Sequence, residues 1–384
     1  MITIIDARRQ QLLAANQKDL TDFQDSDQVL YDRLVIDNDK INGMIRALET
    51  VRSQDDPVGN VLSSSNLPNG LRIENRSAPF GTILIIYESR PDVTVEAAVV
   101  AFKANNKILL KGGKEALNTN KALVDCWHQA LSENGLSTEW IQLIVLDRQG
   151  TRDFLTNPSQ QIDLIVPRGG EQLIAFVKEH AQCAVLVSGR GNNFAYIAGN
   201  ANWDHSVAVV LNAKTDKISA CNALDNVLLD KALPDFDEKL TDLAGRLSDK
   251  GIEVFIAENL ATKLPNMNVI MDENMWYEEF LAPKIRIGQV AGIEEAVSKI
   301  NQYSGGHSAV ILTADAERAG QFMEQVDSAA VYHNASTRFT DGGQMGVGAE
   351  LAISTDKLHH RGPLGLQQLV TNKYFVFGNG QVRE

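Results

Sequence analysis

The sequence predicts an α/β fold in which parallel sheets are covered by helices and divided between two domains. From Gly81 onwards, apolar strand-like runs alternate with helical segments, which is typical of parallel sheets. The strand-like runs are continuously apolar, as expected for strands buried on both faces. A chain of 384 residues also exceeds what one hydrophobic core usually covers. We therefore expect a Rossmann-like unit followed by a second parallel α/β unit.

The segment before Gly81 is expected to be mainly helical. Residues 7–20 and 38–51 are predicted to be helices, and the polar stretch 55–59 breaks the pattern. Residues 70–76 then alternate apolar and polar side chains, as one arm of a two-stranded hairpin does.

The first parallel unit begins with a buried strand at 82–87 and a helix at 95–104 that is apolar all round. A strand at 107–111 follows, and a long helix at 116–134 ends at Gly135 as a C-cap does. The remaining strands of this unit are predicted at 142–146, 163–166 and 184–187.

The segment from Asn212 to Leu229 contains a lysine-bearing polar part, then Cys221, then a strand-like run. We interpret it as a loop that presents Cys221 at the start of a short helix, where backbone N–H groups favour a thiolate. A thiolate is a nucleophile that forms thioesters with acyl groups. The alternative is that Cys221 is a small buried hydrophobe, the usual role of a free cysteine.

After Cys221 the alternation restarts, so the cysteine is expected near the domain boundary, where ligands often bind. The predicted strands are 252–257, 284–287, 308–312 and 329–332, the helices are 293–303 and 316–326, and a last strand-like run covers 374–377.

The net charge and the few cysteines argue against a nucleic-acid-binding, membrane-binding, disulfide-rich or metal-binding protein. The net charge of −13 argues against nucleic acid or an anionic membrane as partner, so an anionic substrate needs a local basic cluster. Cys126, Cys183 and Cys221 are too few and too far apart for a disulfide framework or a metal site. No signal peptide and no apolar stretch of about 20 residues is evident, so we expect a cytoplasmic protein.

Two strand-to-helix turns have the form of coenzyme sites. Arg168, Gly169 and Gly170 follow a predicted strand and open a helix at 172–180, where backbone N–H groups can hold a pyrophosphate. The alternative is a tight turn that happens to use glycines. Lys111 and Lys114 occupy a second such turn.

The Cys221 segment resembles the nucleophile loop of the gamma-glutamyl phosphate reductase family, a branch of the aldehyde dehydrogenase superfamily. Asp225 stands where that family usually has glutamate. The longest similar stretch runs from Val331 to Gly343 and continues through 346–350 and 357–363. The similar motifs occur in the family's order over nearly the whole chain.

The resemblance implies roles for residues in both domains. Lys111 would lie against the adenosine ribose, and Lys114 would either meet a 2′-phosphate, favouring NADPH, or be a solvated lysine. Glu279 would bond the nicotinamide ribose or belong to a surface acidic pair. Ser336, Thr337 and Arg338 would hold the substrate, with a salt link between domains as the alternative for Arg338.

Two positions depart from the family pattern. Asp92 replaces an asparagine whose amide helps to form the oxyanion hole, so other donors suffice, the carboxylate is protonated, or activity is reduced. A turn-forming Pro-Asp pair is the bland alternative. Asn193 replaces a cysteine. Residues 187–193 also lack the carboxylate that activates water in hydrolytic superfamily members, which suits a reductase.

The resemblance implies an aldehyde dehydrogenase-like fold and NADPH-dependent reduction of L-glutamyl 5-phosphate in proline biosynthesis, through a Cys221 thioester. A homo-oligomer, dimer or tetramer, is implied, and glutamate 5-kinase is a candidate partner. A CoA-acylating or other aldehyde dehydrogenase-like enzyme and a non-catalytic nucleotide-binding paralogue stay open. The predicted regions are a coenzyme domain (1–59 and 79–213), a catalytic domain (214–350), and an oligomerisation hairpin and tail (60–78 and 366–384).

Overall fold

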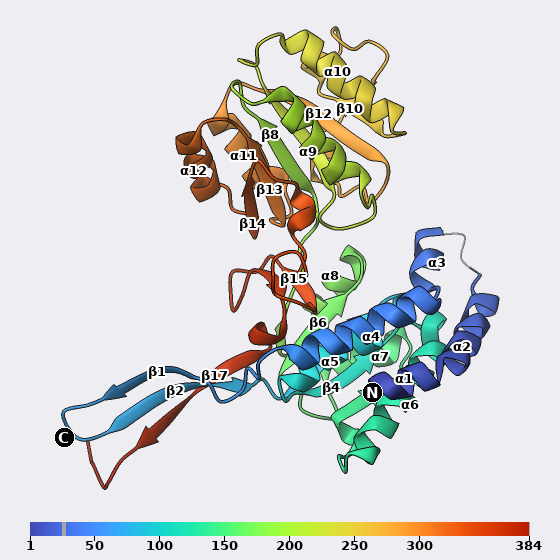
Figure 1. Ribbon diagram of the computed structural model, residues 1–384, viewed down its shortest axis with the longest axis vertical. Helices are drawn as coiled ribbons and strands as arrows, with labels where there is room; N and C mark the ends of the chain where they lie inside the picture. The colour runs from blue at the N-terminus through green and yellow to red at the C-terminus, as the bar shows by residue number, and fades with distance from the viewer. Residues whose placement is uncertain (25–27, 384) are drawn as a thin grey trace. The chain divides into compact units, whose positions relative to one another are not determined.

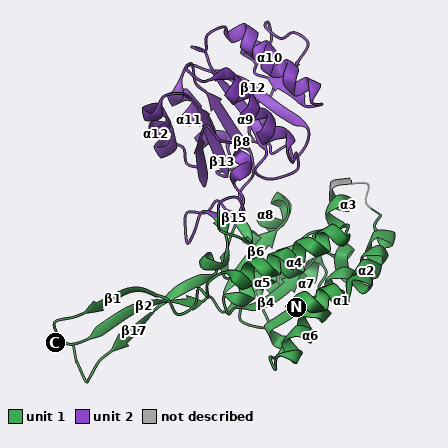
Figure 2. Cartoon of the chain, in the orientation of Figure 1, with its two compact units in different colours: residues 1–187, 346–352, 363–384 green, residues 188–345, 353–362 purple. Residues whose placement is uncertain are grey.

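The computed structural model describes residues 1–24 and 28–383, and the chain divides into two compact units (Figure 1). Unit 1 comprises residues 1–187, 346–352 and 363–384, and unit 2 comprises residues 188–345 and 353–362 (Figure 2). The predicted ranges 1–59 and 366–384 each include residues that lie outside the described ones.

Unit 1 contains a five-stranded parallel sheet of order β5-β4-β3-β6-β7, which confirms the predicted Rossmann-like α/β class. The chain starts at the central strand β3, runs outward through β4 and β5, and then crosses to β6 and β7. In such sheets, ligands bind at the carboxyl ends of the strands, at the point where the strand order reverses. The strands are β3 (Thr82–Tyr87), β4 (Lys107–Lys111), β5 (Ile141–Leu143), β6 (Leu164–Arg168) and β7 (Ala184–Val185).

Helices cover both faces of this sheet. The apolar helix α5 is buried along most of its length, because the N-terminal helices pack against it and enclose the largest core of the unit. The helices of the α/β part are α5 (Val93–Lys103), α6 (Leu117–Glu133), α7 (Arg148–Thr156) and α8 (Glu171–His180), and the N-terminal ones are α1 (Ile2–Ala7), α2 (Arg9–Asp22), α3 (Gln28–Leu34) and α4 (Asn38–Ser53).

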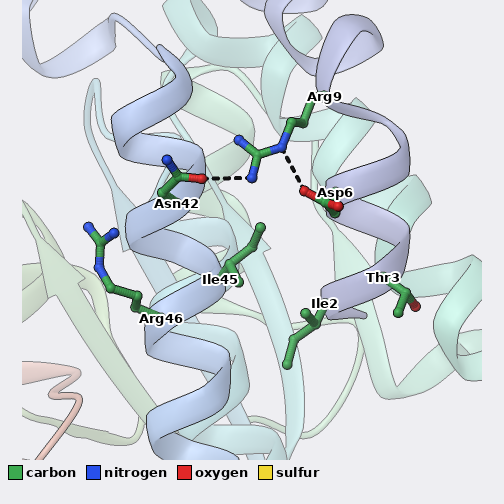
Figure 3. Close-up of a pocket in the computed structure, with 7 residues that line it drawn as sticks. All are labelled: Ile2, Thr3, Asp6, Arg9, Asn42, Ile45 and Arg46. Atoms are coloured by element: carbon green, nitrogen blue, oxygen red, sulfur yellow. Dashed lines mark hydrogen bonds and ion pairs between the residues drawn. The ribbon is translucent and has the colours of Figure 1, made fainter.

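A pocket of about 370 Å³ lies among helices α1, α2 and α4 (Figure 3). Arg9 donates hydrogen bonds to Asp6 (2.7 Å) and Asn42 (2.7 Å) within it. The pocket is lined by Ile2, Thr3, Asp6, Arg9, Asn42, Ile45 and Arg46, so it includes none of the predicted site residues.

An antiparallel three-stranded sheet forms a separate arm of unit 1. The predicted hairpin is present as β1 (Val61–Asn66) and β2 (Arg72–Pro79), and the tail strand β17 (Val370–Phe377) pairs along the whole of β2. The Arg72 guanidinium lies 4.1 Å from the centre of the Phe377 ring across the two strands. The oligomerisation role of this arm stays a prediction.

Unit 2 is built on a seven-stranded parallel sheet of order β11-β10-β12-β9-β8-β13-β14. Its strands are β8 (Asn193–Ile197), β9 (Leu224–Asp230), β10 (Glu253–Ile256), β11 (Asn268–Val269), β12 (Lys284–Val290), β13 (Ser308–Leu312) and β14 (Ala330–His333). One core lies under α9 (Trp203–Thr215) and α10 (Phe236–Asp249), and another under α11 (Ile293–Tyr303) and α12 (Ala316–Gln325). A short sheet of β15 (Ala352–Ser354) and β16 (Gly362–Leu364) lies where the chain passes between the units.

The boundary between the units falls at residue 187, not at the predicted residue 213. Strand β8 pairs with β9 on one side and β13 on the other, and the α9 side chains pack against this sheet, so residues 188–213 belong to unit 2. The predicted roles of the two units as coenzyme and catalytic domains stay predictions. No helix among the described residues is long and apolar enough to cross a membrane.

Candidate active site

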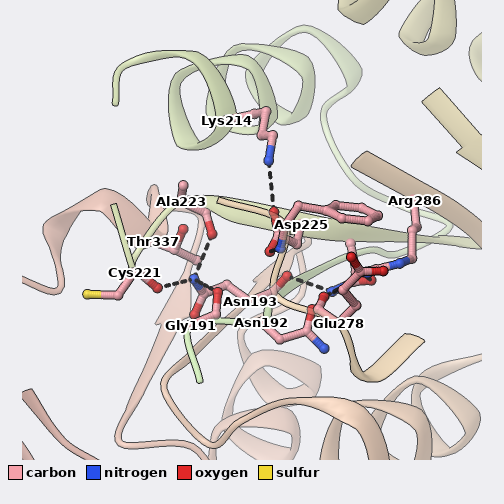
Figure 4. A network of polar contacts seen from close by, with 12 residues as sticks. Gly191, Asn192, Asn193, Lys214, Cys221, Ala223, Asp225, Glu278, Arg286 and Thr337 are labelled. Atoms are coloured by element: carbon pink, nitrogen blue, oxygen red, sulfur yellow. Dashed lines mark hydrogen bonds and ion pairs between the residues drawn. The ribbon is translucent and has the colours of Figure 1, made fainter. Parts of the chain in front are cut away.

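Cys221 lies in a turn that leads into β9, at the amino edge of the seven-stranded sheet. The predicted short helix starting at Cys221 is wrong: the segment makes turn bonds from Ala220 N–H to Lys217 O (3.1 Å) and from Ala223 N–H to Ala220 O (2.9 Å). Asn212–Thr215, expected to be loop, is the end of α9. The half-buried side chain carries its sulfur away from the neighbouring polar network (Figure 4).

Asn193 fixes the backbone at Cys221 and at Ala223, two residues further along. Its buried Nδ2 donates to the carbonyl oxygens of Gly191 (2.8 Å), Cys221 (2.8 Å) and Ala223 (2.6 Å). Two hydrogens are therefore shared among three acceptors, which ties the start of β8 to the cysteine turn (Figure 4). Asn193, which replaces the cysteine of the family pattern, therefore helps to shape the turn that carries Cys221.

The turn is also tied to the predicted substrate residues. Asn222 Nδ2 donates to the carbonyl oxygens of Arg338 (3.2 Å) and Thr340 (2.9 Å), and Thr337 Oγ1 donates to Asn222 O (2.8 Å). Ser336 is buried and its hydroxyl accepts from Arg338 N–H (3.3 Å). The structure therefore brings residues 336–338 next to the cysteine turn, while their contact with substrate stays a prediction.

Arg338 forms an ion pair with Asp216, with its Nε 3.0 Å from the carboxylate. Both residues belong to unit 2, so this ion pair lies within one unit, and both the substrate contact and the salt link between domains stay predictions. The Arg338 side chain is 19% exposed.

Gly191 packs against both Cys221 and Glu279, a relation that the sequence pattern did not indicate. A Cβ at this position would overlap the carbonyl oxygen of Cys221 and lie 2.6 Å from Oε1 of Glu279. Only glycine fits here without a backbone shift. Glu279, predicted to meet the coenzyme, therefore lies beside the cysteine turn.

A buried network of charged and amide side chains lies behind the turn (Figure 4). Lys214 pairs with Asp225 at 2.8 Å, and both side chains are almost fully buried. Burial lowers the pKa of Lys214 and raises that of Asp225, and the contact between the two opposes both shifts. Nearby, Arg286 donates to the Asn226 carbonyl oxygen Oδ1 (2.8 Å), and Asn226 donates to Asn192 Oδ1 (2.6 Å).

The predicted coenzyme residues of unit 1 lie at the carboxyl edge of its sheet. Lys111 ends β4, and exposed Lys114 begins the turn before α6. Burial lowers the pKa of Lys111, against the opposing effect of Glu115 and Glu88. Arg168 ends β6, directly before the two glycines that open α8.

Glu88 already contacts the head of α8. Gly170 N–H donates to its carboxylate at 3.0 Å, and a Cβ at Gly169 would overlap the same carboxylate. Apart from Gly170 and its chain neighbours, no atom of the described residues lies within 4 Å of where a Cβ of Gly170 would stand. Binding of a coenzyme pyrophosphate at this helix start stays a prediction.

Asp92 lies at the head of α5 and pairs with Arg90 at 3.1 Å. Its Oδ1 is buried and has no hydrogen-bond partner among the described residues. Asp92 also opposes the lowering of the Lys40 pKa that burial causes. Its predicted place in an oxyanion hole stays a prediction.

Comparison with known proteins identifies relatives over the full chain. The aldehyde dehydrogenase family matches residues 266–350. Gamma-glutamyl phosphate reductase 1 from Bacillus licheniformis is 41% identical over 378 residues, covering 98% of this chain and 90% of that protein. Gamma-glutamyl phosphate reductase from Shewanella woodyi is 41% identical over 384 residues, covering 99% and 90%.

Solved structures agree. The crystal structure of gamma-glutamyl phosphate reductase from Thermotoga maritima is similar with a TM-score of 0.94 at 40% identity, covering 100% of this chain and 92% of that one. An acetylating aldehyde dehydrogenase from Geobacillus thermoglucosidasius, covering 100% and 91% at 16% identity and a TM-score of 0.68, shares the fold. The predicted fold and resemblance are confirmed: the chain belongs to the gamma-glutamyl phosphate reductase family of aldehyde dehydrogenase-fold oxidoreductases.

Proposed function

We propose that the protein reduces L-glutamyl 5-phosphate to L-glutamate 5-semialdehyde with release of phosphate, using NADPH, as a step of proline biosynthesis. The observation that carries this is the cysteine turn, which Asn193 and Asn222 hold beside residues 336–338 in a chain whose full-length relatives are gamma-glutamyl phosphate reductases. In this proposal Cys221 is the nucleophile, and Arg338, whose backbone the cysteine turn contacts, holds a carboxylate or phosphate of the substrate.

In this proposal the Cys221 thiolate attacks the acyl carbonyl carbon, and the bond from that carbon to the phosphate oxygen breaks. A thioester on Cys221 and free phosphate result. Bound NADPH supplies the hydride that reduces the thioester carbon. The Cys221 backbone N–H donates to the developing oxyanion, and re-formation of the carbonyl expels the Cys221 thiolate and releases the aldehyde.

The coenzyme residues divide between the units in this proposal. Arg168, Gly169 and Gly170 would hold the pyrophosphate at the start of α8, and Lys111 and Lys114 would hold the adenosine end. In unit 2, Glu279 would accept hydrogen bonds from the nicotinamide ribose.

Water activation at the thioester is disfavoured by the segment that faces the turn. Residues 187–193 carry no carboxylate, and Gly191 leaves no room for a side chain beside Cys221. Residues 187–193 therefore supply no general base for hydrolysis of the thioester.

The three-stranded arm supports the proposed homo-oligomer. It exposes a set of apolar side chains, which often marks a protein contact: Val61, Leu62, Tyr374, Val376 and Phe377. Glutamate 5-kinase, whose product would be the substrate, stays a candidate partner.

The test is an oxidation assay on the purified protein with glutamate 5-semialdehyde and NADP⁺. We expect rapid coenzyme reduction that depends on added phosphate. Oxidation that depends on CoA instead would point to a CoA-acylating enzyme, and coenzyme binding without turnover would point to a non-catalytic paralogue. Either result would contradict the proposal.

Lys114→Ala is expected to weaken the binding of NADPH more than the binding of NADH, because only NADPH carries the 2′-phosphate. Losing one charge-assisted contact costs roughly tenfold or more in affinity. The measurement is the Kd of both coenzymes, and Lys121→Ala, at an exposed lysine of α6, is the control. An equal loss for both coenzymes would show that Lys114 does not contact the phosphate.

Asp92→Asn is expected to keep or raise the reductase rate at neutral pH. The substitution replaces a carboxylate, which repels an oxyanion, by an amide that can donate to it. It also breaks the partly exposed pair with Arg90, worth about 0–1 kcal/mol, so the fold should persist. If the variant folds and binds coenzyme but has lost its activity, the prediction that Asp92 stands in the oxyanion hole is wrong.

A further inference from the structure

The segment Glu278–Phe280 carries Glu279 and belongs to no helix or strand. Buried side chains hold its backbone on both sides of Glu279. Asp225 Oδ2, on β9, accepts from Phe280 N–H (3.0 Å), and Arg286 Nη2, on β12, donates to Glu278 O (2.7 Å). Two neighbouring strands of the sheet therefore fix one short irregular segment.

Arg286 is fully buried, and the hydrogen bonds it makes go to neutral groups. Besides Glu278 O, its guanidinium donates to Asn226 Oδ1 (2.8 Å) and stacks 3.7 Å from the centre of the Phe280 ring. Burial lowers its pKa to about 10, so it stays charged at neutral pH. A planar fork can reach both acceptors at once, whereas a lysine ammonium cannot reproduce this geometry.

Asp225 is the second residue that holds this segment, and its buried negative charge is balanced by Lys214 on α9. Buried ion pairs are weak evidence for stability, because desolvation costs about as much as the attraction returns. A geometric role explains the network better, since its bonds converge on the residues that flank Glu279. The Glu279 carboxylate in turn lies beside Gly191 and the Cys221 carbonyl.

We propose that Asp225 and Arg286 are positioning residues that hold Glu279 beside the cysteine turn, so that its carboxylate meets the nicotinamide ribose hydroxyls. Neither residue is assigned a contact with the coenzyme itself. This inference rests on the proposed function, which gives Glu279 to that ribose.

The test measures NADPH binding by its fluorescence, without substrate, in Arg286→Lys, Glu279→Gln and the double variant. Each single change should raise the Kd roughly tenfold to hundredfold, the effect of losing a hydrogen bond to a charged group. Because Arg286 acts through Glu279, the double variant should bind no more weakly than the weaker single. Arg246→Lys, at an exposed arginine of the same unit, is the control and should leave the Kd unchanged.

A matched pair of double variants tests Asp225 without leaving Lys214 unpaired. Lys214→Met with Asp225→Leu removes the acceptor of Phe280 N–H and should raise the Kd, while the Tm is kept or raised. Lys214→Met with Asp225→Asn keeps an acceptor oxygen and should restore binding. If Arg286→Lys does not fold, this pair decides the inference.

Additive effects of Arg286→Lys and Glu279→Gln, or equal Kd values in the matched pair, would overturn the inference. An unchanged Kd in Glu279→Gln would also overturn the inference. The proposed reductase function would still be tested independently by the phosphate-dependent assay. Conversely, a protein that binds NADPH but lacks that activity contradicts the proposed function, and the Kd comparison still decides the positioning roles.

Discussion

Cys221→Ala is expected to lose reductase turnover by about 10⁴-fold or more, because no thioester can form without the sulfur. The Asn193 bonds to the turn go to backbone carbonyl groups, which alanine retains. The fold and the coenzyme Kd should therefore be unchanged. The measurement is steady-state phosphate-dependent oxidation together with NADPH fluorescence.

Cys183→Ala is the matched control, since Cys183 is a partly buried free cysteine of the other unit. It should keep full activity. A Cys221→Ala enzyme within about tenfold of the parent rate would rule out Cys221 as the nucleophile, given the size of effect that nucleophile loss normally has.

Gly191→Ala is expected to lower kcat about hundredfold, although the change is one methyl group. The new Cβ would overlap the carbonyl oxygen of Cys221 and crowd Glu279, so the cysteine turn must shift. A displacement of about 1 Å at a reacting group can cost a factor of about a hundred. Thermal unfolding should also show a lower Tm.

Gly245→Ala provides the control, because Gly245 lies inside α10 and, apart from that helix's own backbone, no atom of the described residues lies within 4 Å of its Cβ position. It should keep activity and gain roughly 0.5–1 kcal/mol of stability from helix propensity. If Gly191→Ala kept the parent kcat, the close packing at the cysteine turn would have no bearing on catalysis.

Most strands of both sheets were predictable because their apolar runs are local signals, but β8 (Asn193–Ile197), which lies inside the second sheet, was not predicted. The second strand set, such as 284–287 and 308–312, appears at the predicted positions. The helix expected at Cys221 was not found, because side-chain amides from 193 and 222 hold that turn in place of helical bonds. Such partners are distant in sequence and leave no periodic pattern.

Residues of the candidate active site could be predicted only where they belong to a motif that is continuous in the sequence. Residues 336–338 and Cys221 stand in long family-like segments, whereas Gly191 and Arg286 become notable only through what they touch. The general rule that ligands gather at the carboxyl ends of parallel strands also does not find Cys221, which precedes β9.

The pairing of β2 with β17 has a consequence for the order in which the chain can fold. Unit 2 is nearly continuous in sequence, but unit 1 needs the last residues of the chain, as the bond from Asn106 to Leu369 O, 263 residues away, also shows. Contacts of such long range form late. During synthesis, the first unit to emerge from the ribosome should therefore be the last to be completed, with β2 unpaired on one edge until β17 arrives.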